Sequence, residues 1–83
     1  MTKETIIQGV VTADGGSVAG AYVRLLDGNG EFTAEVVSSA SGTFRFFAAP
    51  GTWTLRALSP HGNGTSEVTV GRGINEAGVS VTR

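Results

Sequence analysis

The stretch that decides the fold is TFRFFAAPGTWTLRAL, residues 43–58. In its first half Phe44 and Phe46 alternate with Arg45, which is the two-residue period of an extended strand with one face turned to a core. Pro50-Gly51 marks a turn, and the second half resumes the same alternation with a tryptophan and a leucine. These residues predict two strands separated by a turn.

Outward from this stretch, glycine recurs between short runs rich in valine, threonine, phenylalanine and isoleucine. The 83 residues include 13 glycines, which are spread along the chain rather than gathered in one place. Turn signals every ~8–12 residues around such runs are typical of a β-sandwich or barrel. We expect about seven strands, at residues 5–12, 20–27, 31–38, 43–48, 52–58, 66–70 and 78–82. No window long enough for a helix shows a 3.6-residue period free of Gly or Pro, so the expected class is all-β.

The arginines indicate which side of each strand is turned inward. Arg24, Arg45 and Arg56 each lie on one side of an alternating run, so we expect the opposite side to face the core. The expected core comprises Ile7, Val11, Ala21, Val23, Leu25, Val36, Phe44, Phe46, Trp53, Leu55, Ala57, Val68, Val70, Val79 and Val81.

Length and composition limit the function classes. We expect residues 1–83 to be a single domain with one modest core, and a chain without cysteine forms neither a disulfide nor a Cys-based zinc site. The net charge of -1 and the lack of a basic run argue against nucleic acid as a partner. Apolar runs fall far short of the roughly 20 residues of a membrane span, and the first residues contain no signal-peptide core. We therefore expect a cytoplasmic protein that does not enter a membrane.

Three features bear on catalysis, and each has a structural explanation. Gly15–Ala19 is one residue away from a nucleophile-elbow pattern, but no helix follows it, so we interpret it as a turn. Glu31 and Glu35 would lie about 13 Å apart on a strand, whereas the acid/base pairs of glycosidases need roughly 5–9.5 Å. His61 has no acidic neighbour in the sequence and is expected in an exposed loop. We therefore expect no enzyme.

Three loops resemble ligand-binding motifs. Asp27–Glu31 begins like a calcium loop but lacks the later glycine and glutamate, so a hairpin turn is favoured and weak calcium binding is the alternative. Gly71–Gly73 could hold an anion, but no helix N-terminus follows it. Asn63–Thr65 fits a glycosylation acceptor, and without an export signal we interpret it as a turn. We expect no metal and no cofactor.

Four blocks of the sequence, taken in order, resemble a known domain type. They are IQGVV at 7–11, GSVAGAYVRL at 16–25, SGTFRF at 41–46 and PGTWTLRA at 50–57. Together they resemble the carboxypeptidase regulatory-like domains, which are transthyretin-like. The resemblance implies a seven-stranded antiparallel Greek-key β-sandwich of the transthyretin/prealbumin type. Because folding explains these residues, the resemblance carries no reaction.

A narrower resemblance comes from FTAEVV at 32–37 and FRFFAAPG at 44–51. These runs are similar to a small actinobacterial family of unknown function that tends to be encoded beside thiosulfate sulfurtransferases. The resemblance implies a loose link to sulfur metabolism. Members usually carry a short cysteine-containing segment before the first strand. This chain has no cysteine and begins almost at the first expected strand, so the resemblance implies a shortened form.

The expected function is a non-enzymatic binding or accessory module with a protein partner or a second copy of itself. Apolar residues and arginines share the outward side of several strands. The candidate partner-binding residues are Tyr22, Arg24, Leu26, Arg45, Phe47, Arg56 and Leu58. The alternative for Leu26, Phe47 and Leu58 is that bulges at strand ends turn them inward.

Two other functions stay open at this point. One is a small-ligand or carbohydrate-binding domain in which Tyr22 or Trp53 stacks on a sugar, although no small-molecule ligand is identified. The other, weaker, is an oligomeric hydrolase of the transthyretin-like kind, for which one histidine is hardly sufficient.

Overall fold

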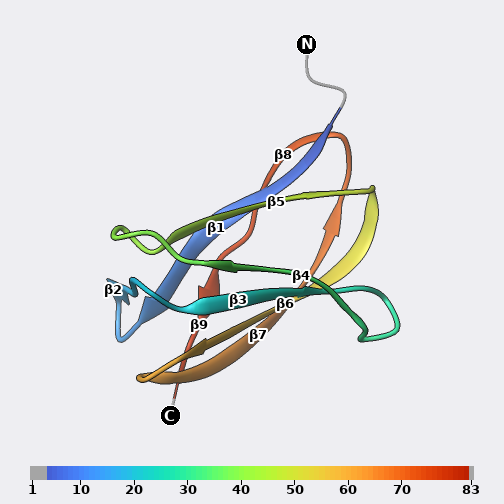
Figure 1. The fold of residues 1–83 in the computed structure, drawn as a ribbon. Helices are drawn as coiled ribbons and strands as arrows, with labels where there is room; N and C mark the ends of the chain where they lie inside the picture. Colours follow the sequence, from blue (N-terminus) through green and yellow to red (C-terminus); the bar gives the residue numbers. More distant parts are fainter. Residues whose placement is uncertain (1–3, 83) are drawn as a thin grey trace.

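Alternation of apolar and polar residues makes most of the chain extended (Figure 1). The computed structural model describes residues 4–82, and because this part contains no helix, none there is long and apolar enough to cross a membrane. The strands are β1 (Thr5–Ala13), β2 (Gly16–Ser17), β3 (Tyr22–Leu26), β4 (Phe32–Val37), β5 (Thr43–Ala48), β6 (Gly51–Ser59), β7 (Gly62–Val70), β8 (Gly73–Glu76) and β9 (Val79–Ser80). The all-β prediction is confirmed.

The first sheet is built around β1. Residues 5–8 of β1 pair antiparallel with β5 and parallel with β8, so these two strands flank β1. Residues 11–13 pair with β2 and β9 further along. The strands β8 and β9 run parallel to β1 because β6 and β7, which belong to the other sheet, carry the chain across the molecule first (Figure 1).

The second sheet has the order β4-β3-β6-β7 and is antiparallel throughout. The pairing of β3 with β6 and of β6 with β7 runs without a break. Between β3 and β4 the register shifts at Leu25/Leu26, so that Leu25 pairs with Ala34 and Leu26 with Phe32. The two sheets pack face to face as a sandwich, as the sequence predicts.

The core between the sheets is filled from alternate strand positions. Ile7 and Phe46 contribute from the first sheet, while Val23, Leu25 and Leu55 contribute from the second. The predicted core residues that are buried are Ile7, Val11, Ala21, Val23, Leu25, Phe44, Phe46, Leu55, Ala57, Val70, Val79 and Val81. Val36 and Val68 are partly buried and pack against this cluster.

Trp53 departs from the expected burial. Its side chain packs against the core but stays partly exposed. The indole Nε1 donates a hydrogen bond of 2.8 Å to the backbone oxygen of Ala49, in the turn before β6. An indole needs a partner for its N–H, and here the turn supplies it at the rim of the core.

The strand count differs from the prediction. Residues 4–82 form nine strands instead of seven, because two residues of a predicted turn pair as β2 and residues 73–76 pair as β8. The expectation of a wholly antiparallel sandwich is wrong for β8 and β9. Four residues beside a glycine-rich loop show too little alternation to indicate a strand. They become the strand β8 because they pair with residues 5–8 of β1.

Two glycines lie where backbones touch. A Cβ on Gly9 would stand 1.5 Å from the backbone oxygen of Ala77, and a Cβ on Gly64 would stand 1.9 Å from that of Ser80. These contacts bring the segment around β9 against both sheets. No side chain fits at either position.

Candidate binding surfaces

The seven candidate partner-binding residues lie on opposite outer faces of the sandwich. Tyr22, Arg24 and Leu26 come from β3 and pair in register with residues of β6, including Arg56 and Leu58. The remaining two, Arg45 and Phe47, are on β5 and therefore belong to the other sheet. Alternation along a strand predicts which side points outward, but it does not say which sheet the strand joins. The seven residues therefore form two separate groups and not one face.

The first surface, here called the tyrosine face, is the outer side of β4, β3 and β6. One row across these strands consists of Val37, Tyr22 and Leu58 in register. Tyr22 is 53% exposed and Val37 56% exposed, while Leu58 is partly buried. Such in-register neighbours have Cβ atoms about 4.5–5.5 Å apart, so the row is continuous.

The next row of the tyrosine face is charged. Glu35, Arg24 and Arg56 lie side by side on the three strands. Arg24 Nε donates to Glu35 Oε2 at 2.7 Å, which is the ion pair found among residues 4–82. Arg56 has no carboxylate partner within that part of the chain. This row therefore contains two guanidinium groups and one carboxylate, which pairs with Arg24.

The second surface, here called the phenylalanine face, is the outer side of β5, β1 and β8. Phe47, Ile6 and Ile74 form one row in register. Phe47 is 64% and Ile74 62% exposed, whereas Ile6 between them is only 9% exposed although it lies outside the main core cluster. Its two neighbours cover it, so the three side chains form one apolar ridge.

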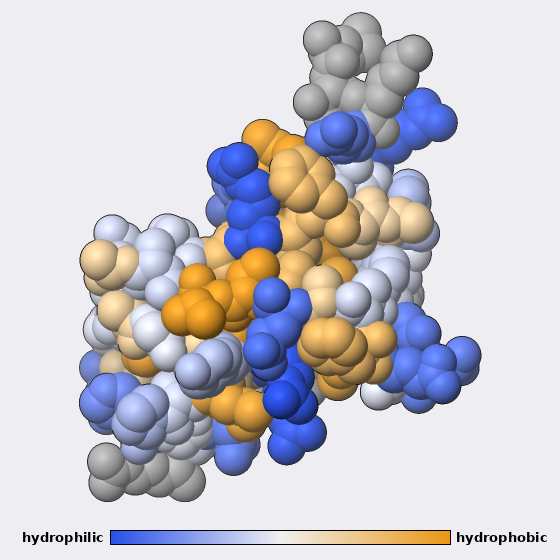
Figure 2. All heavy atoms as spheres, in the orientation of Figure 1, coloured by the Kyte–Doolittle hydropathy of each residue, from blue (hydrophilic) through white to orange (hydrophobic). Residues whose placement is uncertain are grey.

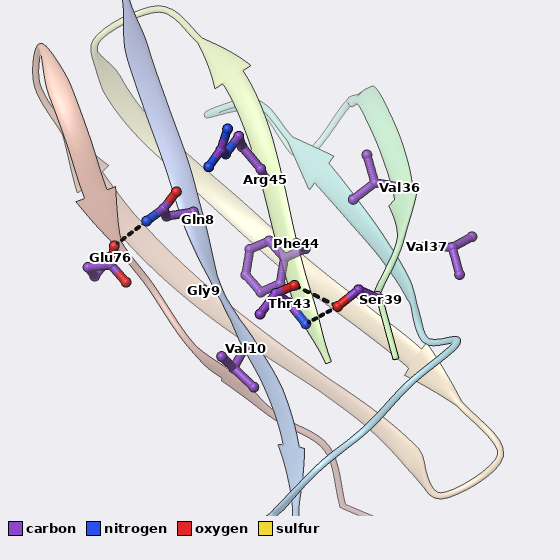
Figure 3. A pocket seen from close by; sticks show the side chains of 10 residues that line it. All are labelled: Gln8, Gly9, Val10, Val36, Val37, Ser39, Thr43, Phe44, Arg45 and Glu76. Atoms are coloured by element: carbon purple, nitrogen blue, oxygen red, sulfur yellow. Dashed lines mark hydrogen bonds between the residues drawn. The ribbon is translucent and has the colours of Figure 1, made fainter. Parts of the chain in front are cut away.

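The row beside this ridge is polar and runs Arg45, Gln8, Glu76. Figure 3 shows Gln8 lying between the other two. Gln8 Nε2 donates to Glu76 Oε2 at 2.7 Å. Arg45 forms no ion pair with any residue from 4 to 82. The row is therefore positive at its β5 end and negative at its β8 end.

An open hollow of about 580 Å³ lies over β1 and β5 and reaches β4 (Figure 3). Apart from Arg45, the polar side chains that line it bond to one another, since Ser39 Oγ and Thr43 Oγ1 lie 2.6 Å apart and Gln8 binds Glu76. Among residues 4–82, no group of three or more His, Cys, Asp or Glu side chains gathers that could hold a metal ion. His61 lies exposed in the turn between β6 and β7, away from this hollow.

Two of the three loops singled out in the sequence have structural roles, whereas the interpretation of Asn63–Thr65 as a turn is wrong because these residues pair with β6 as part of β7. Asp27 Oδ1 accepts hydrogen bonds from the backbone N–H groups of Asn29 at 2.8 Å and Glu31 at 3.0 Å, so the favoured hairpin turn is confirmed. In the 71–73 loop, the N–H of Gly71 donates to Asn75 Oδ1 and that of Gly73 to the backbone oxygen of Glu4. These N–H groups are already used and do not form a cradle for an anion.

Sequence reasoning missed Val37 and Ile74 as exposed residues, and it missed Ile6 as the residue between Phe47 and Ile74 in the apolar ridge. Ile6 and Val37 belong to predicted strands, but both occupy the outward positions of their alternation. Ile74 lies in the strand that was not expected. The hydrophobic surface in the view of Figure 2 is accordingly broken into separate patches between hydrophilic residues, one of them over β4.

The fold and its two mixed faces define a β-sandwich domain. The chain belongs to the family described as "Protein of unknown function (DUF1416)", whose model matches residues 1–81. This confirms a family of unknown function with actinobacterial members.

The mycobacterial relatives agree with that assignment. The chain is 62% identical over 84 residues to "Uncharacterized protein Rv0814c" of Mycobacterium tuberculosis, covering 99% of this chain and 84% of the relative. It is 63% identical over 83 residues to an uncharacterized protein of Mycolicibacterium smegmatis, covering 98% of this chain and 92% of that one.

Two solved structures share the fold at low sequence identity. A DUF3823 family protein from Parabacteroides merdae has a TM-score of 0.73 at 20% identity, covering 99% of this chain. GBS52, the minor pilin of Streptococcus agalactiae, has a TM-score of 0.69 at 14% identity, covering 100% of this chain. This chain spans 47% of each of those chains. The likeness shows the fold alone, and none of these descriptions names an enzymatic activity.

Proposed function

We propose that the chain is a non-enzymatic binding module that docks a protein partner on the tyrosine face. The observation that carries this proposal is the adjacency of the Val37–Tyr22–Leu58 row to the row that contains Arg24 and Arg56. Single exposed apolar residues are ordinary on protein surfaces. A continuous row with an exposed tyrosine beside two arginines has the composition that protein interfaces favour.

The charge of the tyrosine face indicates the chemistry of the partner. Arg24 and Arg56 are directly opposite on neighbouring strands, and like charges in that position are unfavourable. Glu35 neutralises one of them through its 2.7 Å ion pair. A partner that brings an acidic side chain to Arg56, beside an apolar residue packed on Tyr22, would complete this row.

Three finer points belong to this proposal. The four sequence blocks support a relationship with carboxypeptidase regulatory-like domains, and the resemblance to families encoded beside thiosulfate sulfurtransferases makes such an enzyme the first partner to test. A partner of that kind would place the chain in the cytoplasm. Catalysis has no part in this proposal.

The experiment is a binding titration with a purified actinobacterial thiosulfate sulfurtransferase. We expect the parent chain to bind, and Tyr22→Ala and Arg56→Glu each to weaken binding by about tenfold or more, because both remove groups from the centre of the face. Arg45→Glu is the matched control, since it makes the same charge change on the opposite face. Equal binding by all variants would reject the tyrosine face. No binding by the parent would reject the sulfurtransferase as partner.

The carbohydrate alternative finds less support. Trp53 packs its ring against the core and uses its N–H within the chain. Tyr22 lies in a row across a sheet rather than in a groove, because its neighbours Val37 and Leu58 are in register with it.

A further inference from the structure

We propose that two copies of this chain associate through the phenylalanine face, with a twofold axis parallel to β1. This surface is separate from the tyrosine face, and the inference does not depend on the proposed partner. It rests on the pattern of apolar and charged residues across β5, β1 and β8.

The apolar component is the ridge of Phe47, Ile6 and Ile74. The outer two side chains are 64% and 62% exposed and are the largest exposed hydrophobic side chains of the first sheet within residues 4–82. Because Phe47 and Ile74 lie in one register row on either side of the buried Ile6, a flat partner surface would cover both together. A second copy offers such a surface, since its own ridge has the same length and spacing.

The charge pattern of the polar row is complementary to the same row in a second copy. Arg45 and Glu76 lie on opposite sides of β1, each one strand away from it. Strands in a sheet are about 4.7–4.9 Å apart, so the two residues stand about 10 Å apart along the row. Gln8 fills the space between them and binds Glu76. The ends of this row therefore carry opposite charges that do not pair with each other.

A twofold axis parallel to β1 exchanges the two sides of that strand. Applied to the phenylalanine face, it lays Arg45 of one copy against Glu76 of the other, and the reverse pair forms at the same time. Phe47 then meets Ile74 of the second copy on either side of the axis, while Ile6 of each copy supports these contacts from below. The rotation that aligns all the apolar contacts thus also forms two reciprocal ion pairs, as the self-complementary surface of a twofold dimer requires.

Other ways of stacking the same faces lack this match. An axis that runs along the polar row itself would put Arg45 against Arg45 and Glu76 against Glu76, and such juxtaposed like charges are strongly unfavourable at an interface. An axis along the apolar ridge would leave the charges of each copy without a counterpart from the polar row. The charge pattern therefore chooses one orientation.

Sedimentation of the full chain over a range of concentrations tests the proposal. We expect the parent to dimerise and to dissociate on dilution, because a patch spanning three strands lies at the small end of specific interfaces. Arg45→Glu and Glu76→Arg should each weaken the dimer by about tenfold or more, because each places two like-charged pairs face to face.

The decisive sample is an equal mixture of those two variants. Each variant supplies the charge that the other has lost, so the mixture should form a heterodimer about as strong as the parent dimer. Arg56→Glu, which changes the charge equally on the opposite face, should leave dimerisation unchanged. Phe47→Glu should abolish it while circular dichroism still shows a folded sandwich.

Three results would overturn the proposal. They are a parent that stays monomeric at every concentration, a single charge variant that dimerises like the parent, and a mixture that fails to recover the dimer. If Phe47→Glu unfolds, the charge variants and their mixture decide alone. None of these outcomes bears on partner binding at the tyrosine face, which is measured separately.

Discussion

On the tyrosine face Arg24 and Glu35 are on neighbouring strands and bond at 2.7 Å, whereas on the phenylalanine face Arg45 and Glu76 are two strands apart with Gln8 between them. On the tyrosine face, Glu35 pairs with Arg24 and leaves the guanidinium of Arg56 without a carboxylate among residues 4–82. The phenylalanine face keeps its charges apart and balanced. The same residue types, spaced by one strand or by two, therefore create surfaces with different charge patterns.

The largest effect is expected from a substitution in the core, which supports both faces. Leu55→Ala should lower the free energy of unfolding by about 2–5 kcal/mol, because it opens a cavity at a fully buried position. Urea denaturation measures the loss. A loss under about 0.5 kcal/mol, ordinary for surface substitutions, would mean that the assigned inner face of β6 is wrong.

A second change should disturb the first sheet more than the second. Gly9→Ala places a Cβ 1.5 Å from the backbone oxygen of Ala77 and must push the β8–β9 connection outward. We expect a loss of about 3 kcal/mol, the upper range for overpacking, and less hydrogen-exchange protection in β8 and β9 than in β3 and β6. Gly28→Ala is the control, since it meets nothing within 4 Å. Equal stability of the two variants would contradict the close approach.

The hairpin that joins β3 and β4 gives a smaller effect. Asp27→Ala removes the acceptor of two backbone hydrogen bonds, at 2.8 and 3.0 Å. The thermal unfolding midpoint should fall by an amount that corresponds to a loss of about 1–2 kcal/mol in the free energy of unfolding, because each exposed bond contributes about 0.5–1.5 kcal/mol. Millimolar calcium should not change the midpoint of the parent. A calcium-induced rise that Asp27→Ala abolishes would instead favour the weak calcium loop.

The smallest effect compares the two carboxylates directly. Glu35→Gln breaks an exposed ion pair and should lower stability by about 0.2–1 kcal/mol, with less effect in high salt. Glu76→Gln loses a charge whose nearest partner is the neutral amide of Gln8, so its effect on the monomer should be smaller still. A larger loss for Glu76→Gln, measured in dilute solution, would show that Arg45 and Glu76 interact within one copy.

The sequence predicts some of these features well and others not at all. The inward positions of β3, β5 and β6 follow from the alternation of Val23, Phe46 and Leu55 with arginines. The partition of those strands between two sheets does not follow, because strand pairing depends on contacts between distant residues. This is why Arg45 and Phe47 were grouped with residues that lie on the opposite face.

The missed strand and the half-buried tryptophan have local reasons. The residues of β8 are too few to show a period, and Asn75 looks like a loop residue although its amide Nδ2 donates to the backbone oxygens of Ile6, Gly71 and Gly73. Trp53 occupies an inward position, yet the hydrogen bond from its indole to Ala49 holds it at the rim. Side-chain hydrogen bonds of this kind leave no trace in a hydrophobic pattern.

The position of residues 79–82 has a consequence for how the protein is made. Residues Val79 and Ser80 pair with β1 in the first sheet, while Thr82 exchanges two backbone hydrogen bonds, of 3.1 and 2.9 Å, with Asn63 in the second. During synthesis β1 leaves the ribosome long before these partners do. The sandwich therefore closes only after translation has passed Thr82, and until then β1 presents an unpaired edge to the chaperones and nascent chains around it.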